Sequence, residues 1–121
     1  MQKLTEQEVF SPFIGKAINH DVFGELAHDN SSEYVIYSSR YLGKPNYQEL
    51  FGITDKLKEH WEYSGVDFNL YLSLEGEIIT KCHIDKYREG GGGHGRPMIN
   101  VLKETQQELR VARRIMHYIT K

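Results

Sequence analysis

The residues best suited to chemistry in this sequence lie in one glycine-rich, basic segment, Arg88 to Pro97. Glycine adopts positive φ angles without strain and lets backbone amides approach and surround an anion. Arginine adds a planar fork of donors that matches phosphate oxygens. The pattern therefore predicts a phosphate-binding loop. The residues expected to bind are Arg88, Gly90, Gly91, Gly92, Gly93, His94, Gly95 and Arg96.

The context of this segment separates it from two known phosphate-binding motifs. Gly90, Gly92 and Gly95 have the spacing of the dinucleotide fingerprint, but a hairpin strand is expected before them and no parallel strand returns after them. No Lys-Ser or Lys-Thr pair follows the glycines, as a phosphate-loop ATPase requires. Pro97 suits the first position of a helix, whose N-terminus would add partial positive charge. A connector whose glycines only avoid strain is the alternative interpretation.

The C-terminal segment adds two arginines and an apolar stripe. Arg110 and Arg114 lie one helical turn apart, so we include them in the predicted ligand site, although a solvated basic helix face is the simpler interpretation. A stripe at helical spacing runs through Met98, Leu102, Leu109, Ala112, Met116 and Ile119. It fits either the core of the same chain or a symmetric helix pair. We expect a homo-oligomer through this helix.

Metal binding and catalysis have weaker support. His83 and Asp85 point to one side of a predicted strand, but their third partner, His94, would come from the glycine segment, so no metal site and no cofactor are predicted. Cys82, the one cysteine, is expected on the core face of the sheet, and no serine nucleophile is indicated. We therefore assign no catalytic residue and expect a binding protein rather than an enzyme.

Composition limits the class of partner and the compartment. The 121 residues suit a single domain, residues 1–121, and 15 basic against 17 acidic side chains give a net charge of −2. This balance argues against extended nucleic acid, whose binding normally needs many phosphate contacts. The polar N-terminus and the lack of a long apolar run lead us to expect a cytoplasmic protein that does not enter membranes.

Hydrophobic periodicity predicts the elements that position these residues. A capping box at Thr5 and Glu8 starts a helix near Glu6, which Ser11-Pro12 interrupts. The remaining elements are strands at 22–27 and 34–42, a helix from Asn46 to Ser64, strands at 66–74 and 77–87, and a helix from Pro97. The fold class is therefore α+β, a four-stranded antiparallel sheet of two hairpins with helices on one face, in the order helix-hairpin-helix-hairpin-helix.

Alternation is clearest in the second hairpin. Apolar residues at every second position from Val66 to Leu74 predict one buried and one solvated face. A connection at 74–76 would pair Leu72 with Ile78 and Phe68 with Cys82.

Two functional hypotheses follow. The first is a non-catalytic oligomeric binding protein for a phosphate-bearing, nucleotide-derived small molecule, held by the glycine-rich loop and the arginines. Tyrosines on the sheet could stack the base: Tyr34, Tyr37, Tyr41, Tyr71 and Tyr87. The second is a small inhibitor or immunity-type protein that acts by binding another protein through a tyrosine-rich, mixed-charge sheet face.

Overall fold

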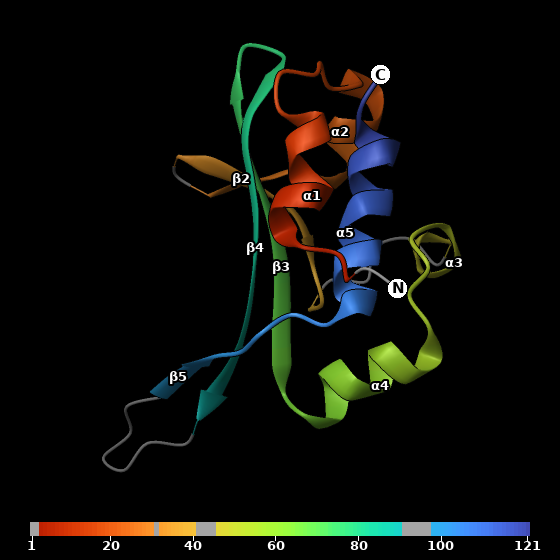
Figure 1. The fold of residues 1–121 in the computed structure, drawn as a ribbon, viewed down its shortest axis with the longest axis vertical. Helices are drawn as coiled ribbons and strands as arrows, with labels where there is room; N and C mark the ends of the chain where they lie inside the picture. Colours follow the sequence, from red (N-terminus) through yellow and green to blue (C-terminus); the bar gives the residue numbers. More distant parts are fainter. Residues whose placement is uncertain (1–2, 31, 41–45, 91–97) are drawn as a thin grey trace.

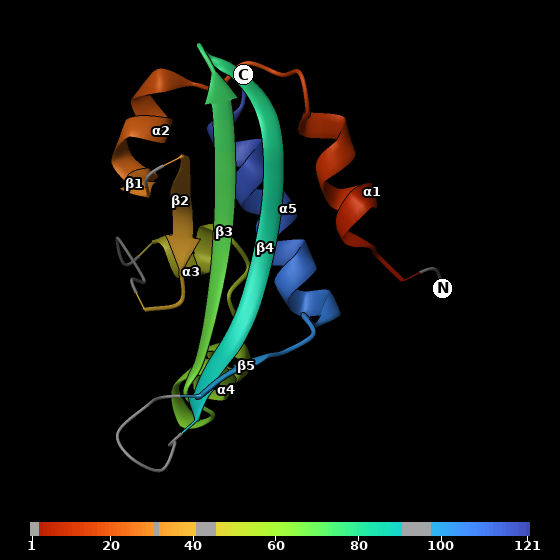
Figure 2. The same ribbon diagram turned by 90° about the vertical axis from the view of Figure 1, so that its left-hand side faces the viewer.

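The fold is a twisted antiparallel sheet with its helices packed on one face, as Figures 1 and 2 show. The structure is a computed structural model that describes residues 3–30, 32–40, 46–90 and 98–121. Within these ranges the sheet has five strands in the order β1-β2-β3-β4-β5. The predicted α+β class and the order of helices and hairpins are confirmed, and β5 is added to the sheet.

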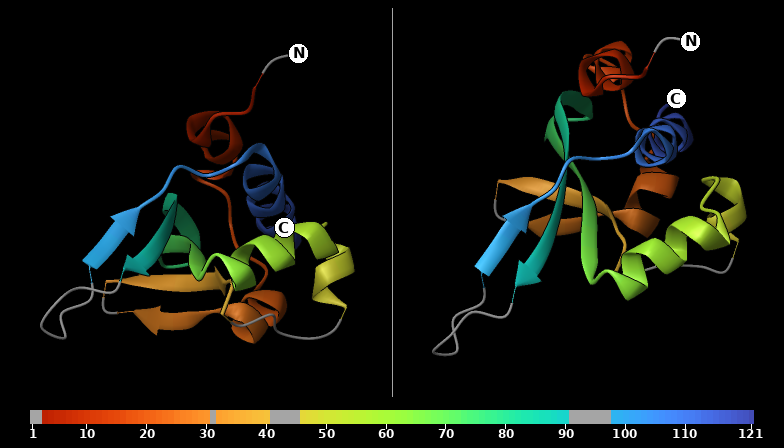
Figure 3. Two further views of the ribbon diagram at one scale, coloured as in Figure 1. Left: turned by 90° about the horizontal axis from the view of Figure 1, so that it is seen from below. Right: turned by 60° about the horizontal axis from the view of Figure 1, so that its bottom comes forward.

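The elements have the following bounds. The strands are β1 His28–Asn30, β2 Glu33–Ser38, β3 Val66–Glu75, β4 Ile78–Gly90 and β5 Met98–Val101. The helices are α1 Glu6–Phe10, the 3₁₀ helix Ser11–Phe13, α2 His20–Leu26, α3 Tyr47–Leu50, α4 Asp55–Tyr63 and α5 Gln106–Ile119. Figure 3 shows from two further directions that the helices lie on one side of the sheet.

The N-terminal helix starts and breaks where the sequence predicts. The Thr5 side chain accepts a hydrogen bond from the Glu8 amide at 3.1 Å, which satisfies one of the free amides of the first turn. Pro12 follows within the 3₁₀ turn, because proline cannot continue the α-helical hydrogen bonds of α1.

The long β3–β4 hairpin keeps the predicted buried face along most of its length but not the predicted partners. Leu72 pairs with Cys82 and Phe68 with Lys86, which is four residues further along β4 than predicted. The turn is shorter than expected, since Glu75 already pairs with Ile78 and Gly76 takes a φ of 63°. An even shift preserves the side-chain alternation, so the buried face is correct for β3 and for Cys82 and Ile84 although the register is wrong. Near the turn the prediction is wrong, because a bulge between Ser73 and Leu74 reverses the alternation: Ile79 is buried, and Ile78 and Thr80 are exposed.

The strand predicted at 22–27 is wrong. These residues belong to α2, and β1 begins only at His28. Phe23 and Leu26 are three positions apart and therefore lie on one side of a helix, where Leu26 is buried and Phe23 packs edge-on against Tyr34. The apolar residues of this segment are compatible with either a strand or a helix. Packing against β2 stabilises the helix.

The helix predicted from Asn46 to Ser64 is two helices. Gly52, with a φ of 72°, ends α3, and the Thr54 side chain accepts from the Leu57 amide at 3.1 Å to start α4. Apolar residues continue at helical spacing across the break, which explains why periodicity alone missed it.

Gly52 and Gly24 give a matched pair of stability predictions. We expect Gly52→Ala to lower the free energy of unfolding by about 1–2 kcal/mol, because a side chain is strained at positive φ. Its Cβ would also lie 3.2 Å from the Arg114 guanidinium carbon. Gly24 lies inside α2 with open space around it, so Gly24→Ala should raise stability by about 0.5–1 kcal/mol. Urea unfolding of both variants checks the opposite signs.

The C-terminal helix starts later than predicted. Residues Met98–Val101 form β5 and pair antiparallel with β4, and α5 begins at Gln106 after a capping box between Thr105 and Glu108. The predicted helical stripe therefore loses its first two members. Its remaining residues, Leu109, Ala112, Met116 and Ile119, are buried in the core of the same chain.

One charged cluster lies inside the core and joins three elements. The Lys86 ammonium of β4 pairs with the Glu108 carboxylate of α5 at 2.9 Å, and the Trp61 indole of α4 donates to the same carboxylate at 2.7 Å. The Thr105 amide donates to it as well, at 2.8 Å. Since Glu108 is completely buried, these donors supply the hydrogen bonds that its charge requires.

Candidate binding site

The predicted glycine-rich site falls mostly outside the described residues. Residues 91–97, which include His94 and Arg96, are not described, and its first glycine, Gly90, pairs with Met98 at the end of β4. The segment therefore connects two antiparallel strands. The prediction that a helix follows the glycines directly is wrong, because Met98–Val101 forms β5 and α5 begins only at Gln106.

The arginines predicted to share this site lie on different elements. Arg88 is exposed in β4 opposite Asn100, and Arg110 is exposed on α5. Arg114 packs over Gly52 at the junction of α3 and α4. The β4–β5 hairpin extends away from α5 in both side views (Figures 1 and 2), so the structure does not gather Arg88 and Arg114 around one point.

A cavity of about 420 Å³ lies instead beside the edge of β2. Pairing between β1 and β2 ends at Val35, so the described strands leave the edge of β2 beyond it without a partner. The cavity follows this edge onto both faces of the sheet, because residues of α2 and α3 line it together with Asn69 and Tyr87 from the open face. Its lining residues are Glu25, Leu26, His28, Val35, Ile36, Tyr37, Ser38, Arg40, Tyr47, Asn69 and Tyr87.

A β-bulge shapes the cavity wall. The register between β2 and β3 shifts between Val35 and Tyr37, which inserts Ile36 as an extra residue. Ile36 and Tyr37 are consequently both buried, although they are neighbours in a strand. After the bulge, Ser38 of β2 pairs with Asn69 of β3, and both side chains lie on the face of the sheet opposite to Tyr37. This pair is buried as well.

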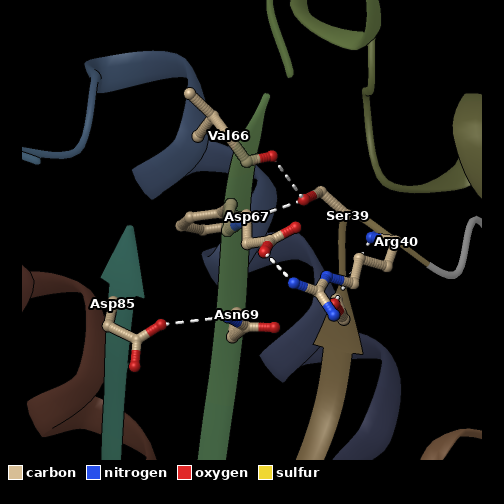
Figure 4. Close-up of polar contacts among 8 residues, drawn as sticks. Ser39, Arg40, Val66, Asp67, Asn69 and Asp85 are labelled. Carbon is tan, nitrogen blue, oxygen red and sulfur yellow. Dashed lines mark hydrogen bonds and ion pairs between the residues drawn. The ribbon is translucent and has the colours of Figure 1, made fainter. Parts of the chain in front are cut away.

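Polar contacts fix the end of the cavity near Asn69, as Figure 4 shows. The Asn69 amide nitrogen donates to Asp85 at 3.1 Å, and the Arg40 guanidinium pairs with Asp67. The Ser39 hydroxyl accepts from the Phe68 amide at 2.9 Å and fixes the chain leading to Arg40. The amide oxygen of Asn69 points away from Asp85, toward the side of Arg40 (Figure 4).

Tyrosine hydroxyls lie toward the helices. Tyr47 of α3 donates to Glu25 at 3.1 Å and stacks on Phe51. Burial, followed by the Glu25 carboxylate, raises the pKa of Tyr47 to about 12, so it remains a donor at neutral pH. Burial also raises the pKa of Tyr37, and its buried hydroxyl has no hydrogen-bond partner among the described residues. Such an orphaned donor costs about 1–3 kcal/mol and is uncommon in folded proteins.

The open face of the sheet carries a second polar cluster. Tyr71 stacks on His83 with ring centroids 4.7 Å apart, and His83 pairs with Glu33 at 2.8 Å. Burial and Asp85, which also hydrogen-bonds to it, raise the pKa of Tyr71. The predicted candidates His83 and Asp85 thus lie on one face, but each has its own partner. No three metal-ligating side chains gather within the described ranges, and His94 lies outside them.

Cys82 has the environment expected of a packed thiol. It pairs with Leu72 and packs against the core from the helix side of the sheet. Burial raises the pKa of its thiol to about 12, so at neutral pH it is not the thiolate that acts as a nucleophile.

The sequence reasoning missed most of the cavity residues. Tyr37 and Tyr87 were expected as stacking surfaces, but Ser38, Arg40 and Asn69 were not considered as binding residues. The burial of Asn69 could be seen only after β2 and β3 were paired. In the alternating pattern of the strand, Asn69 occupies a position that predicts exposure to solvent.

Comparison with known proteins provides no relative for this chain. No protein-family model, curated protein or solved structure matches it. Among the described residues, none of the helices is both long enough and apolar enough to span a bilayer.

Proposed function

We propose that this protein is a non-catalytic binding protein for a small organic molecule, which it holds in the cavity beside β2. The cavity volume carries this proposal, because about 420 Å³ lies within the range of small-molecule sites. The wall has the usual mixture of apolar side chains, such as Leu26 and Ile36, and a few fixed polar groups, such as Ser38 and Asn69.

Two further features support binding rather than catalysis. The thiol of Cys82 is protonated and packed against the core. The polar groups at the cavity, including Arg40 and Asn69, are held by Asp67 and Asp85 in an arrangement that positions a ligand without an activated nucleophile.

Native mass spectrometry of freshly purified protein tests the proposal. We expect a bound small molecule of a few hundred daltons or less, at up to one per chain. Val35→Trp should reduce the bound fraction by at least tenfold, because the indole would fill the cavity that Val35 lines. Val101→Trp is the matched control, since Val101 is 82% exposed on β5 and lies outside the lining.

Circular dichroism first checks that each variant is folded, so that a lost bound mass can be attributed to the cavity. Equal loss of the bound mass in both variants would contradict binding in this cavity. If no small molecule is retained, soaking the protein in a metabolite extract before the measurement repeats the test, and a second negative result rejects the proposal.

Protein binding is the second candidate, favoured by the open face of the sheet. The helices leave this face uncovered, and it carries the Tyr71–His83 stack and charges of both signs, as interfaces often do. An inhibitor or immunity-type protein would use such a face. A stoichiometric complex with one protein, lost in Tyr71→Ala but kept in Val35→Trp, would favour this function.

Phosphate binding by the glycine-rich segment and homo-oligomerisation stay predictions. Calorimetry with Gly92→Val tests the first, because a side chain there would forbid positive φ and obstruct an anion. Sedimentation of the native chain at high concentration tests the second.

A further inference from the structure

Resting on the proposed function, we infer that the small molecule is a short peptide that binds in an extended conformation and adds an antiparallel strand to the edge of β2. Pairing between β1 and β2 ends at Val35, and among the described strands none lies beside residues 36–38 on that side. A strand edge of this kind offers backbone donors and acceptors with which an extended peptide can pair.

The backbone of Ser38 is the pairing point at this edge. In an antiparallel sheet, the N–H and C=O groups of successive residues point alternately toward the two neighbouring strands. The Ser39 amide donates to the Phe68 carbonyl of β3 at 2.9 Å, so the N–H and C=O of Ser38 point the other way, toward the open edge. Ser38 lines the cavity and is only 6% exposed, so little of it contacts bulk water, and one peptide residue would satisfy both groups.

The cavity has the shape that an added strand requires, because it reaches both faces of the sheet. Leu26 and Tyr47 line it from the helix side, and Asn69 and Tyr87 line it from the open face. Successive side chains of a strand point to opposite faces, so an extended peptide fills both parts while its backbone stays at the edge. A ring stacked on either face would fill only one of them.

The two faces select different side chains. The peptide residue opposite Ser38 points to the open face, beside the polar side chains of Ser38 and Asn69. Its two neighbours point to the helix side, where Leu26 and Ile36 provide apolar surface. The preferred peptide is therefore apolar, polar and apolar in three successive residues.

Formal charges on the lining suit a peptide without charged side chains. With His28 neutral, the charged groups among the described lining residues are the carboxylate of Glu25 and the guanidinium of Arg40, which sum to zero. Glu25 also accepts from the Tyr47 hydroxyl, and Arg40 is paired with Asp67. The lining therefore selects neither an anion nor a cation, and a zwitterionic peptide meets no net charge.

Titration calorimetry with the tripeptides Leu-Ser-Leu, Val-Asn-Val and Phe-Thr-Leu tests the inference. We expect at least one to bind, and N-methylation of its central residue to weaken binding about tenfold or more, because the methyl group removes the N–H that donates to the Ser38 carbonyl. The matched control carries the N-methyl group on the third residue, whose N–H faces away from β2, and should bind within about threefold of the parent peptide. Val35→Trp should weaken binding about tenfold or more, whereas Val101→Trp should leave it within about twofold, since only Val35 lines the cavity.

No binding by any of the three tripeptides would overturn the inference, as would equal effects of the two N-methyl groups or a larger effect of the third-residue group. A native chain that is dimeric in sedimentation and becomes monomeric as Val35→Trp would also overturn it, because a second copy would then occupy the edge. A non-peptide mass retained in native mass spectrometry, with no tripeptide bound, would reject the inference and leave the proposed function standing. Failure of both experiments would reject both.

Discussion

Replacing Lys86 by methionine is expected to lower the free energy of unfolding by about 3–5 kcal/mol. The Lys86 side chain is 5% exposed and its ammonium is the cationic partner of a completely buried carboxylate, Glu108. Methionine would fill similar space but leave that carboxylate without a counter-charge. Trp61 and Thr105 would still donate to it, yet neutral donors compensate a buried charge only in part.

Lys81→Met provides the matched control for this prediction. Lys81 lies on the same strand, but it is exposed, so its replacement should change stability by no more than about 0.5 kcal/mol. Urea unfolding followed by Trp61 fluorescence measures both variants. Equal, small effects at the two lysines would show that the buried ion pair does not stabilise this fold.

Met116→Asp is expected to prevent folding at every protein concentration. Met116 is completely buried, so the variant loses a core side chain, at a cost of about 2–5 kcal/mol, and buries a carboxylate without a partner, at several more. The sum is comparable with the whole stability of a small domain, about 5–15 kcal/mol.

Arg113→Asp is the control on the same helix. Its side chain is exposed, so the variant should fold like the native protein. Circular dichroism and sedimentation separate the two uses of the apolar stripe. A folded, monomeric Met116→Asp variant would show that the stripe is an interface between copies rather than the core of one chain.

Short-range signals in the sequence predicted the elements where local and tertiary preferences agree. The capping box at Thr5 and the alternation from Val66 to Leu74 were sufficient for α1 and β3, because hydrogen bonding and burial there depend on neighbours in sequence. The start of α5 was also available, since Thr105 and Glu108 have capping-box spacing. The prediction placed the start of this helix at Pro97 instead, because proline is favoured in a first helical turn.

The sequence by itself determined the fold class, the buried face of β3 and the approximate position of the central hairpin. Only the tertiary structure decided the partners across the sheet, because an even register shift preserves every face and leaves no trace in alternation. The same holds for the pairing of Lys86 with Glu108 and for the cavity beside β2. Both arise where segments that are distant in the sequence pack together. Neither segment alone shows that a charge will be buried or that a strand edge will have no partner.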